Sequence, residues 1–129
     1  MTPSPPYEKR IAILSANAED AADFRNQVEK DNYRTETYAT LSDLADGLAA
    51  NPCLAVILDT DSIALDNSMI RNLNTSHPTV YFLLASRVRF HPELKESISK
   101  ILYACLKKPA DFDEISYLLK SFRYADTTT

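Results

Sequence analysis

Leu54-Ala55-Val56-Ile57-Leu58-Asp59 is the stretch of sequence that decides the fold. Its five apolar residues follow Pro52 and precede the polar run Thr60–Ser62, which predicts a short strand buried on both faces. A carboxylate at the end of such a strand is costly to bury without a partner. Because ligands bind at the carboxyl ends of the strands in open α/β sheets, Asp59 is the first candidate functional residue.

The composition is that of one ordinary globular domain. The chain has 129 residues, of which 45% are hydrophobic and 25% charged, and its net charge is −4. This charge gives no basic surface for nucleic acid or an anionic membrane, and no apolar run reaches the length of a membrane span. We therefore expect a cytoplasmic protein without a direct nucleic-acid or membrane partner. A domain of residues 10–124 is expected between disordered tails, residues 1–9 and 125–129.

Few residues offer the chemistry of a metal or nucleotide site. The two cysteines, Cys53 and Cys105, lie in apolar contexts and are expected to be buried, reduced thiols. With two histidines and no Cys/His cluster, no zinc or redox-metal site is expected. Gly47 is the only glycine, which excludes the glycine-rich loops that bind phosphates or dinucleotides.

Strand and helix patterns alternate five times along the chain. Alternating βα units imply a parallel sheet covered on both faces, and right-handed crossovers favour the flavodoxin-like, doubly wound α/β fold with strand order 2-1-3-4-5. Asn17 and Thr40 are predicted to cap the first two helices, and Met69 and Ile98 are among the positions predicted to face the core. Strands are predicted at 11–14, 33–39, 54–59, 79–85 and 102–106, and helices at about 18–30, 41–50, 66–74, 92–101 and 111–123.

This arrangement resembles the receiver domain of bacterial response regulators over residues 10–124. The residues that carry the resemblance are Asp59, which ends the third strand, and Lys108-Pro109, which follow the fifth strand and precede a short amphipathic helix. The resemblance implies that a histidine kinase phosphorylates Asp59 in a two-component phosphorelay and that Lys108 contacts the phosphoryl oxygens. It also implies that the backbone carbonyl of Asp61 is a magnesium ligand.

The acidic pair that holds Mg²⁺ in receivers is missing. Its places after the first strand are taken by Ser15 and Ala16, followed by Asn17, and none of these residues is charged. These residues are expected at the rim of the pocket, together with Asp61. We therefore expect no cofactor and no Mg²⁺ binding near Asp59 at millimolar concentrations.

Both switch residues of the family are also displaced. The serine or threonine that ends the fourth strand falls on Leu84, so that Ser86 can contact a phosphoryl group only if the register shifts. The aromatic residue of the fifth strand falls on Cys105. The pattern therefore indicates a degenerate receiver, or pseudo-receiver, in which Asp59 forms a structural ion pair with Lys108.

The expected function is docking to a protein partner rather than catalysis. The resemblance implies that the fourth helix, fifth strand and fifth helix bind a kinase, an output protein or a second copy of the chain. Tyr117 and Tyr124 on the last helix are the interface candidates, because aromatic residues are enriched in interface cores. The basic residues Arg87, Arg89, Lys107 and Lys108 are a candidate anion-attracting rim.

Two alternatives remain open. The first is a divergent receiver that is still phosphorylated at Asp59 and then requires Mg²⁺. The second is a haloacid-dehalogenase-like phosphatase, in which Asp59 attacks phosphorus and Asp61 protonates the leaving group. That motif normally ends the first strand of its domain, whereas two βα units precede it here.

Overall fold

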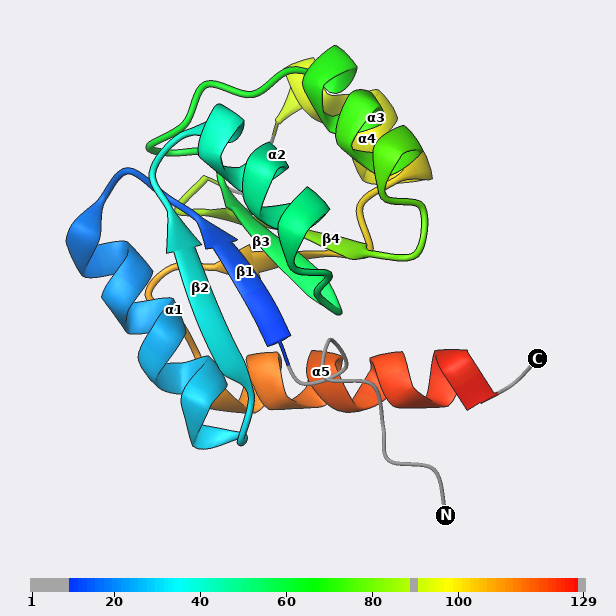
Figure 1. Cartoon of the computed structure of the whole chain (residues 1–129). Helices are drawn as coiled ribbons and strands as arrows, with labels where there is room; N and C mark the ends of the chain where they lie inside the picture. The colour runs from blue at the N-terminus through cyan, green and yellow to red at the C-terminus, as the bar shows by residue number, and fades with distance from the viewer. Residues whose placement is uncertain (1–9, 89–90, 128–129) are drawn as a thin grey trace.

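Five parallel strands form one sheet in the order β2-β1-β3-β4-β5, as the sequence predicts (Figure 1). The computed structural model describes residues 10–88 and 91–127, with side chains as far as Phe122, so the predicted tail of residues 1–9 lies outside the described residues. The strands are β1 (Arg10–Leu14), β2 (Arg34–Tyr38), β3 (Ala55–Asp59), β4 (Tyr81–Ser86) and β5 (Ala104–Lys107). The helices are α1 (Ala18–Lys30), α2 (Leu41–Ala50), α3 (Asn67–Ser76), α4 (Lys95–Lys100) and α5 (Phe112–Thr127), with a 3₁₀ turn, η2 (Pro92–Leu94), before α4.

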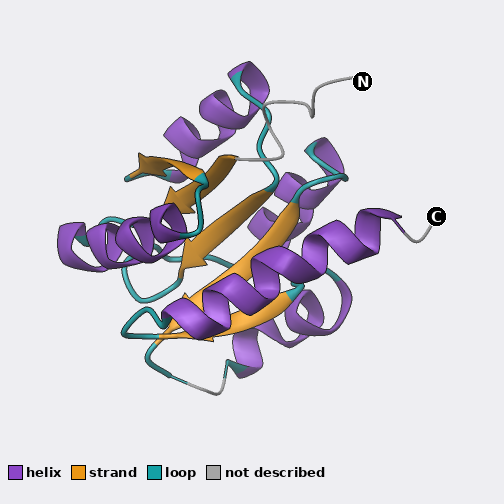
Figure 2. Cartoon of the chain, turned by 90° about the horizontal axis from the view of Figure 1, so that it is seen from below, coloured by secondary structure: helices purple, strands orange, loops and turns teal. Residues whose placement is uncertain are grey.

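Helices cover both faces of the sheet, and β3 is buried between them (Figures 1 and 2). Ala55 and Ile57 of β3 pack in the core layer shared with α1 and α5. Val56 and Leu58 pack in the opposite layer, with α2 and α3. All five residues of β3 are buried, which confirms the prediction of a strand without an exposed face.

Short polar side chains cap the N-termini of α1 and α2. The Asn17 side chain accepts a hydrogen bond from the Asp20 amide at 3.0 Å, and Thr40 accepts one from the Asp43 amide at 3.1 Å. Both contacts satisfy amides that the first helical turn leaves without a partner. The predicted caps are therefore confirmed, and the Asn17 cap also fixes where α1 begins beside β1.

Three predictions of buried positions are wrong. Met69 and Ile98 are 37% and 36% exposed. The buried residue of α4 is Ser97 instead. The preceding 3₁₀ turn buries Leu94, and the position three residues later, Ser97, lies on the same face. Cys105 is an exposed free thiol, since β5 is an edge strand, whereas Cys53 is buried as predicted.

Several element ends also differ from the prediction by one to four residues. The fourth strand continues one residue past its predicted end at Ala85, to Ser86, because the backbone stays paired with β5 through Lys107. The last helix continues to Thr127 instead of ending at Arg123.

Gly47 in α2 permits the close approach of the Tyr38 ring. A Cβ atom at this position would overlap the ring, and the Tyr38 hydroxyl is fixed by a 2.6 Å hydrogen bond to Glu36. Overpacking costs about 1–3 kcal/mol, against about 1 kcal/mol of gained helix propensity. We expect Gly47→Ala to lower the free energy of unfolding, measured by urea denaturation. In a Tyr38→Ala background the same change should be neutral or stabilising, and a stabilising effect in the native background would contradict this packing.

Candidate functional site

Three carboxylates surround the ammonium group of Lys108 at the carboxyl edge of the sheet. Nζ donates to Asp59 Oδ1 at 2.5 Å and to Asp20 Oδ2 at 2.9 Å, and it lies 3.2 Å from Asp61 Oδ2. The side chains of Lys108 and Asp59 are each 1% exposed. An ammonium group has three N–H donors, so these carboxylates match its full donor capacity. The predicted Asp59–Lys108 ion pair is present, within a larger cluster.

Both oxygens of Asp59 are occupied by donors from the protein. Oδ2 accepts hydrogen bonds from the hydroxyls of Ser15 and Ser62 at 2.7 and 2.8 Å. Oδ1 accepts from the Asp61 amide at 3.0 Å in addition to Lys108. A carboxylate offers about four lone-pair positions, so the hydrogen-bonding capacity of Asp59 is filled.

Arg87 adds a second cation to the cluster. Its Nη1 and Nη2 atoms donate to the two oxygens of Asp20 at 3.0 and 2.8 Å, a bidentate contact. Nη1 also lies 3.7 Å from Asp61 Oδ2, which accepts a 2.9 Å hydrogen bond from the Arg87 amide. The Arg87 side chain is 58% exposed, whereas that of Asp20 is 11% exposed, so the guanidinium covers Asp20 from the solvent side.

The contacts shift the pKa values of Asp20, Asp61 and Lys108 toward the charged forms. The hydrogen bond from Arg87 is the main reason that the pKa of Asp20 falls to about 2. Burial alone would raise the pKa of Asp61, but hydrogen bonds from the Arg87 amide, Ser86 and Lys108 outweigh it and lower that pKa. Burial alone would lower the pKa of Lys108, but its hydrogen bonds to Asp59 and Asp20 raise it.

The predicted rim residues divide into two groups. Ser15 contacts Asp59 directly, and Ala16 joins the site through its amide, which donates to Ser62 Oγ at 2.9 Å. Asn17 instead caps α1. Ser62, which no motif in the sequence marks as a site residue, thus connects the β1–α1 and β3–α3 loops.

Ser86, not Leu84, stands at the carboxyl end of β4. Leu84 is buried opposite Cys105, and it is Ala85 that pairs with Asp59 in the sheet register. The hydroxyl of Ser86 donates to Asp61 Oδ1 at 2.9 Å. The assignment of the strand end to Leu84 is therefore wrong, because the apolar run stops before the strand does.

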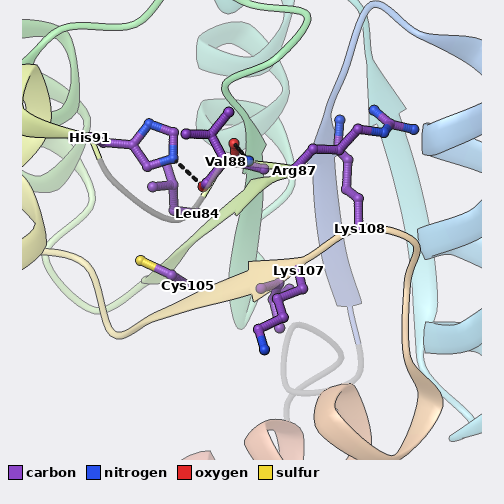
Figure 3. A pocket seen from close by; sticks show the side chains of 9 residues that line it. Leu84, Arg87, Val88, His91, Cys105, Lys107 and Lys108 are labelled. Carbon is purple, nitrogen blue, oxygen red and sulfur yellow. Dashed lines mark hydrogen bonds between the residues drawn. The ribbon is translucent and has the colours of Figure 1, made fainter.

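The predicted basic rim is only partly present. Lys107 and Lys108 point in opposite directions at the end of β5, and only Lys108 lies on the side of Arg87 (Figure 3). Arg89 lies outside the described residues.

A cavity of about 300 Å³ lies beside the charged cluster. Cys105 and Leu84 line it, together with His91, whose ring contacts the Val88 carbonyl at 2.8 Å (Figure 3).

The donor set does not fit Mg²⁺, which prefers octahedral coordination by oxygen. The carboxylates of Asp20, Asp59 and Asp61 converge on an ammonium group, and Arg87 binds both oxygens of Asp20. Among the side chains of residues 10–88 and 91–122, no three His, Cys, Asp or Glu groups are arranged to hold a metal ion.

The chain matches no family model and no curated protein sequence, but it is similar to many solved structures. A CheY-like receiver domain from Methylobacillus flagellatus is 17% identical, with a TM-score of 0.77 over 88% of this chain and 98% of that one. The beryllofluoride-activated NtrC4 receiver domain dimer is 16% identical, with a TM-score of 0.77 over 88% and 95%. A pilus assembly-related protein from Burkholderia pseudomallei is 20% identical, with a TM-score of 0.74 over 95% and 94%. At these low identities, the TM-scores show a shared CheY-like fold and no more. None of the helices described here is long and apolar enough to cross a membrane.

Acid should weaken the fold through Asp20. Because its pKa drops from 3.8 to about 2 in the folded state, its charge stabilises the fold above pH 3.8, and that stabilisation is lost as the pH falls toward 2. We expect Asp20→Asn to cost about 1–3 kcal/mol at neutral pH, and the difference from the native chain to shrink in acid. Urea denaturation over this pH range measures the effect.

The matched control is Asp46→Asn, which changes an exposed carboxylate on α2. If the native chain and the Asp20 variant lose stability in parallel as the pH falls, Asp20 is not held in its charged form by this cluster.

Proposed function

We propose that this chain is a receiver-like signalling domain that acts by docking to protein partners, without conventional Mg²⁺-dependent phosphorylation of Asp59. The observation that carries the proposal is the Lys108 ammonium, whose donors are directed at Asp59, Asp20 and Asp61. In phosphoryl transfer, a lysine in this position would have to donate to the oxygens of the incoming phosphoryl group. All three N–H groups of the Lys108 ammonium are already directed at carboxylates, so none is free to donate to a phosphoryl oxygen.

The surroundings of Asp59 support the proposal independently. To attack phosphorus, one of its oxygens would have to lose a contact with Lys108, Ser15 or Ser62. The cluster holds three carboxylates against two cations, so its formal charge is already negative before a phosphoryl group arrives. Enzymes that transfer phosphoryl groups offset this charge with divalent cations, and the donor set here does not suit one.

The alternative of a divergent, phosphorylated receiver draws support from the alignment of Asp59, Ser86 and Lys108 along one sheet edge. The phosphatase alternative has less support. It needs Asp61 as a protonated acid, whereas hydrogen bonds from Arg87, Ser86 and Lys108 hold its pKa below the ordinary value.

The docking surface that we propose lies on α4, β5 and α5. Tyr103 before β5 and Tyr117 on α5 are 42% and 73% exposed. The Tyr103 hydroxyl contacts Ser121 Oγ at 2.9 Å, which places Tyr117, one turn earlier in the helix, on the side of α5 that borders β5. The side chain of Tyr124 lies outside the described residues. Partners of this surface would be a kinase, an output protein or a second copy of the chain. Of the structural neighbours, the activated NtrC4 receiver domain is a dimer.

Acetyl phosphate and Mg²⁺ provide the direct test of the chemistry. After incubation with both, we expect the intact mass of the native chain to stay unchanged, because Asp59 and Lys108 already satisfy each other. Asp59→Asn is the control that assigns any added mass. A phosphoryl adduct on the native chain that disappears in this variant would replace the proposal with the divergent receiver.

Replacing Tyr117 by serine tests the docking surface. Aromatic hot spots cost more than about 1 kcal/mol when truncated, so self-association or partner binding should weaken by about fivefold or more. Sedimentation measures the effect, circular dichroism checks the fold, and Lys120→Ser on the same helix is the control. The Tyr117→Ser/Tyr124→Ser double variant should show at least the same loss. A native chain that is monomeric at every concentration, with partner binding unchanged in both variants, would argue against this surface.

A further inference from the structure

Two cations that differ in position offset most of the negative charge of the carboxylate cluster. Lys108 lies inside, with a side chain that is 1% exposed, and contacts all three carboxylates. Arg87 lies outside, with a side chain that is 58% exposed, and contacts Asp20 and Asp61. With Lys108 alone the formal charge of the cluster would be −2, and Arg87 brings it to −1. Arg87 is thus the cation that can be removed without opening the buried ion pair.

The contacts of Arg87 occupy the side of the cluster that faces solvent. Both oxygens of Asp20 accept from the guanidinium, at 2.8 and 3.0 Å, and Asp61 Oδ2 is held by the Arg87 amide at 2.9 Å. A planar guanidinium matches a carboxylate better than an ammonium does, because it donates two parallel hydrogen bonds. Any cation arriving from solvent would have to displace this contact first.

Arg87 also joins three parts of the fold. It follows β4 directly, its side chain reaches Asp20 in the first turn of α1, and its amide binds Asp61 after β3. The next amide, that of Val88, donates to Ser86 Oγ at 3.0 Å. The segment after β4 is therefore tied to the cluster by backbone and side-chain contacts together.

We propose that Arg87 is a built-in counter-cation, which takes the place of a divalent ion at this edge of the sheet and keeps such ions out. Removing its side chain leaves Asp20 Oδ1 without its donor, whereas Asp20 Oδ2 keeps Lys108 and Asp61 keeps Ser86, Lys108 and the backbone amide of residue 87. The formal charge of the cluster is then −2, and the freed oxygen faces solvent beside Asp61. Lys108 still neutralises the buried centre, so the fold persists. The inference rests on the proposed function only in that both assume a native site that does not bind divalent cations.

The experiment compares Mn²⁺ binding to the native chain and to Arg87→Ala. Calorimetry gives the binding isotherm, and paramagnetic broadening of the amide resonances around Asp59 and Asp61 locates the ion. We expect only heat of dilution from the native chain and a saturable isotherm, with local broadening, from the variant. Arg71→Ala removes an exposed arginine paired with Glu96 and should behave as the native chain does. Asp20→Asn/Arg87→Ala should lose the binding that Arg87→Ala gains.

The possible outcomes separate this inference from the proposed function. A folded Arg87→Ala variant that gives no saturable Mn²⁺ binding overturns the inference and leaves the proposed function in place. Equal binding by the native chain overturns both. If Arg87→Ala does not fold, Arg87→Gln keeps the stem of the side chain without its charge, and the same two outcomes apply to it.

Discussion

The buried ammonium of Lys108 is the group on which the carboxyl edge of the sheet depends. It forms ion pairs with Asp20 of α1, Asp59 of β3 and Asp61 of the loop after β3. Removing one partner from a buried ion pair typically costs about 3–5 kcal/mol, because it leaves an uncompensated charge behind. The cluster thus fixes the relative positions of α1, β3 and the end of β5, and it does so with side chains that would otherwise be available for chemistry.

The same contacts connect the fold to the function that we propose. The apolar run of β3 is buried on both faces, so Asp59 at its end is only 1% exposed. A carboxylate buried to this extent is destabilising unless other groups hydrogen-bond to it. Lys108, Ser15 and Ser62 are those groups. A site whose donors and acceptors satisfy each other has little to gain from an incoming phosphoryl group. What remains available is the outer surface, where exposed tyrosines lie near β5.

Much of this could be predicted from the sequence, for identifiable reasons. The central strand, the strand order and the caps at Asn17 and Thr40 follow from local patterns and from the handedness of crossovers. The roles of Asp20 and Arg87 could not be predicted. An acidic residue in the first turn of a helix is already explained by the helix dipole, and an arginine after a strand is usually solvated. Their contact joins residues far apart in the chain, and only the parallel sheet, which puts the start of α1 and the residue after β4 at the same carboxyl edge, brings them together.

The measurement that tests the central claim most directly is the nuclear magnetic resonance signal of the Lys108 side-chain ammonium in a ¹⁵N-labelled chain. If three carboxylates hold this group, its protons exchange slowly with water at neutral pH, and its shift responds to both Asp59→Asn and Asp20→Asn. The account predicts a protected, protonated Nζ whose pKa lies above the ordinary value for lysine. An ammonium that exchanges as fast as those of exposed lysines, and that ignores both substitutions, would contradict it.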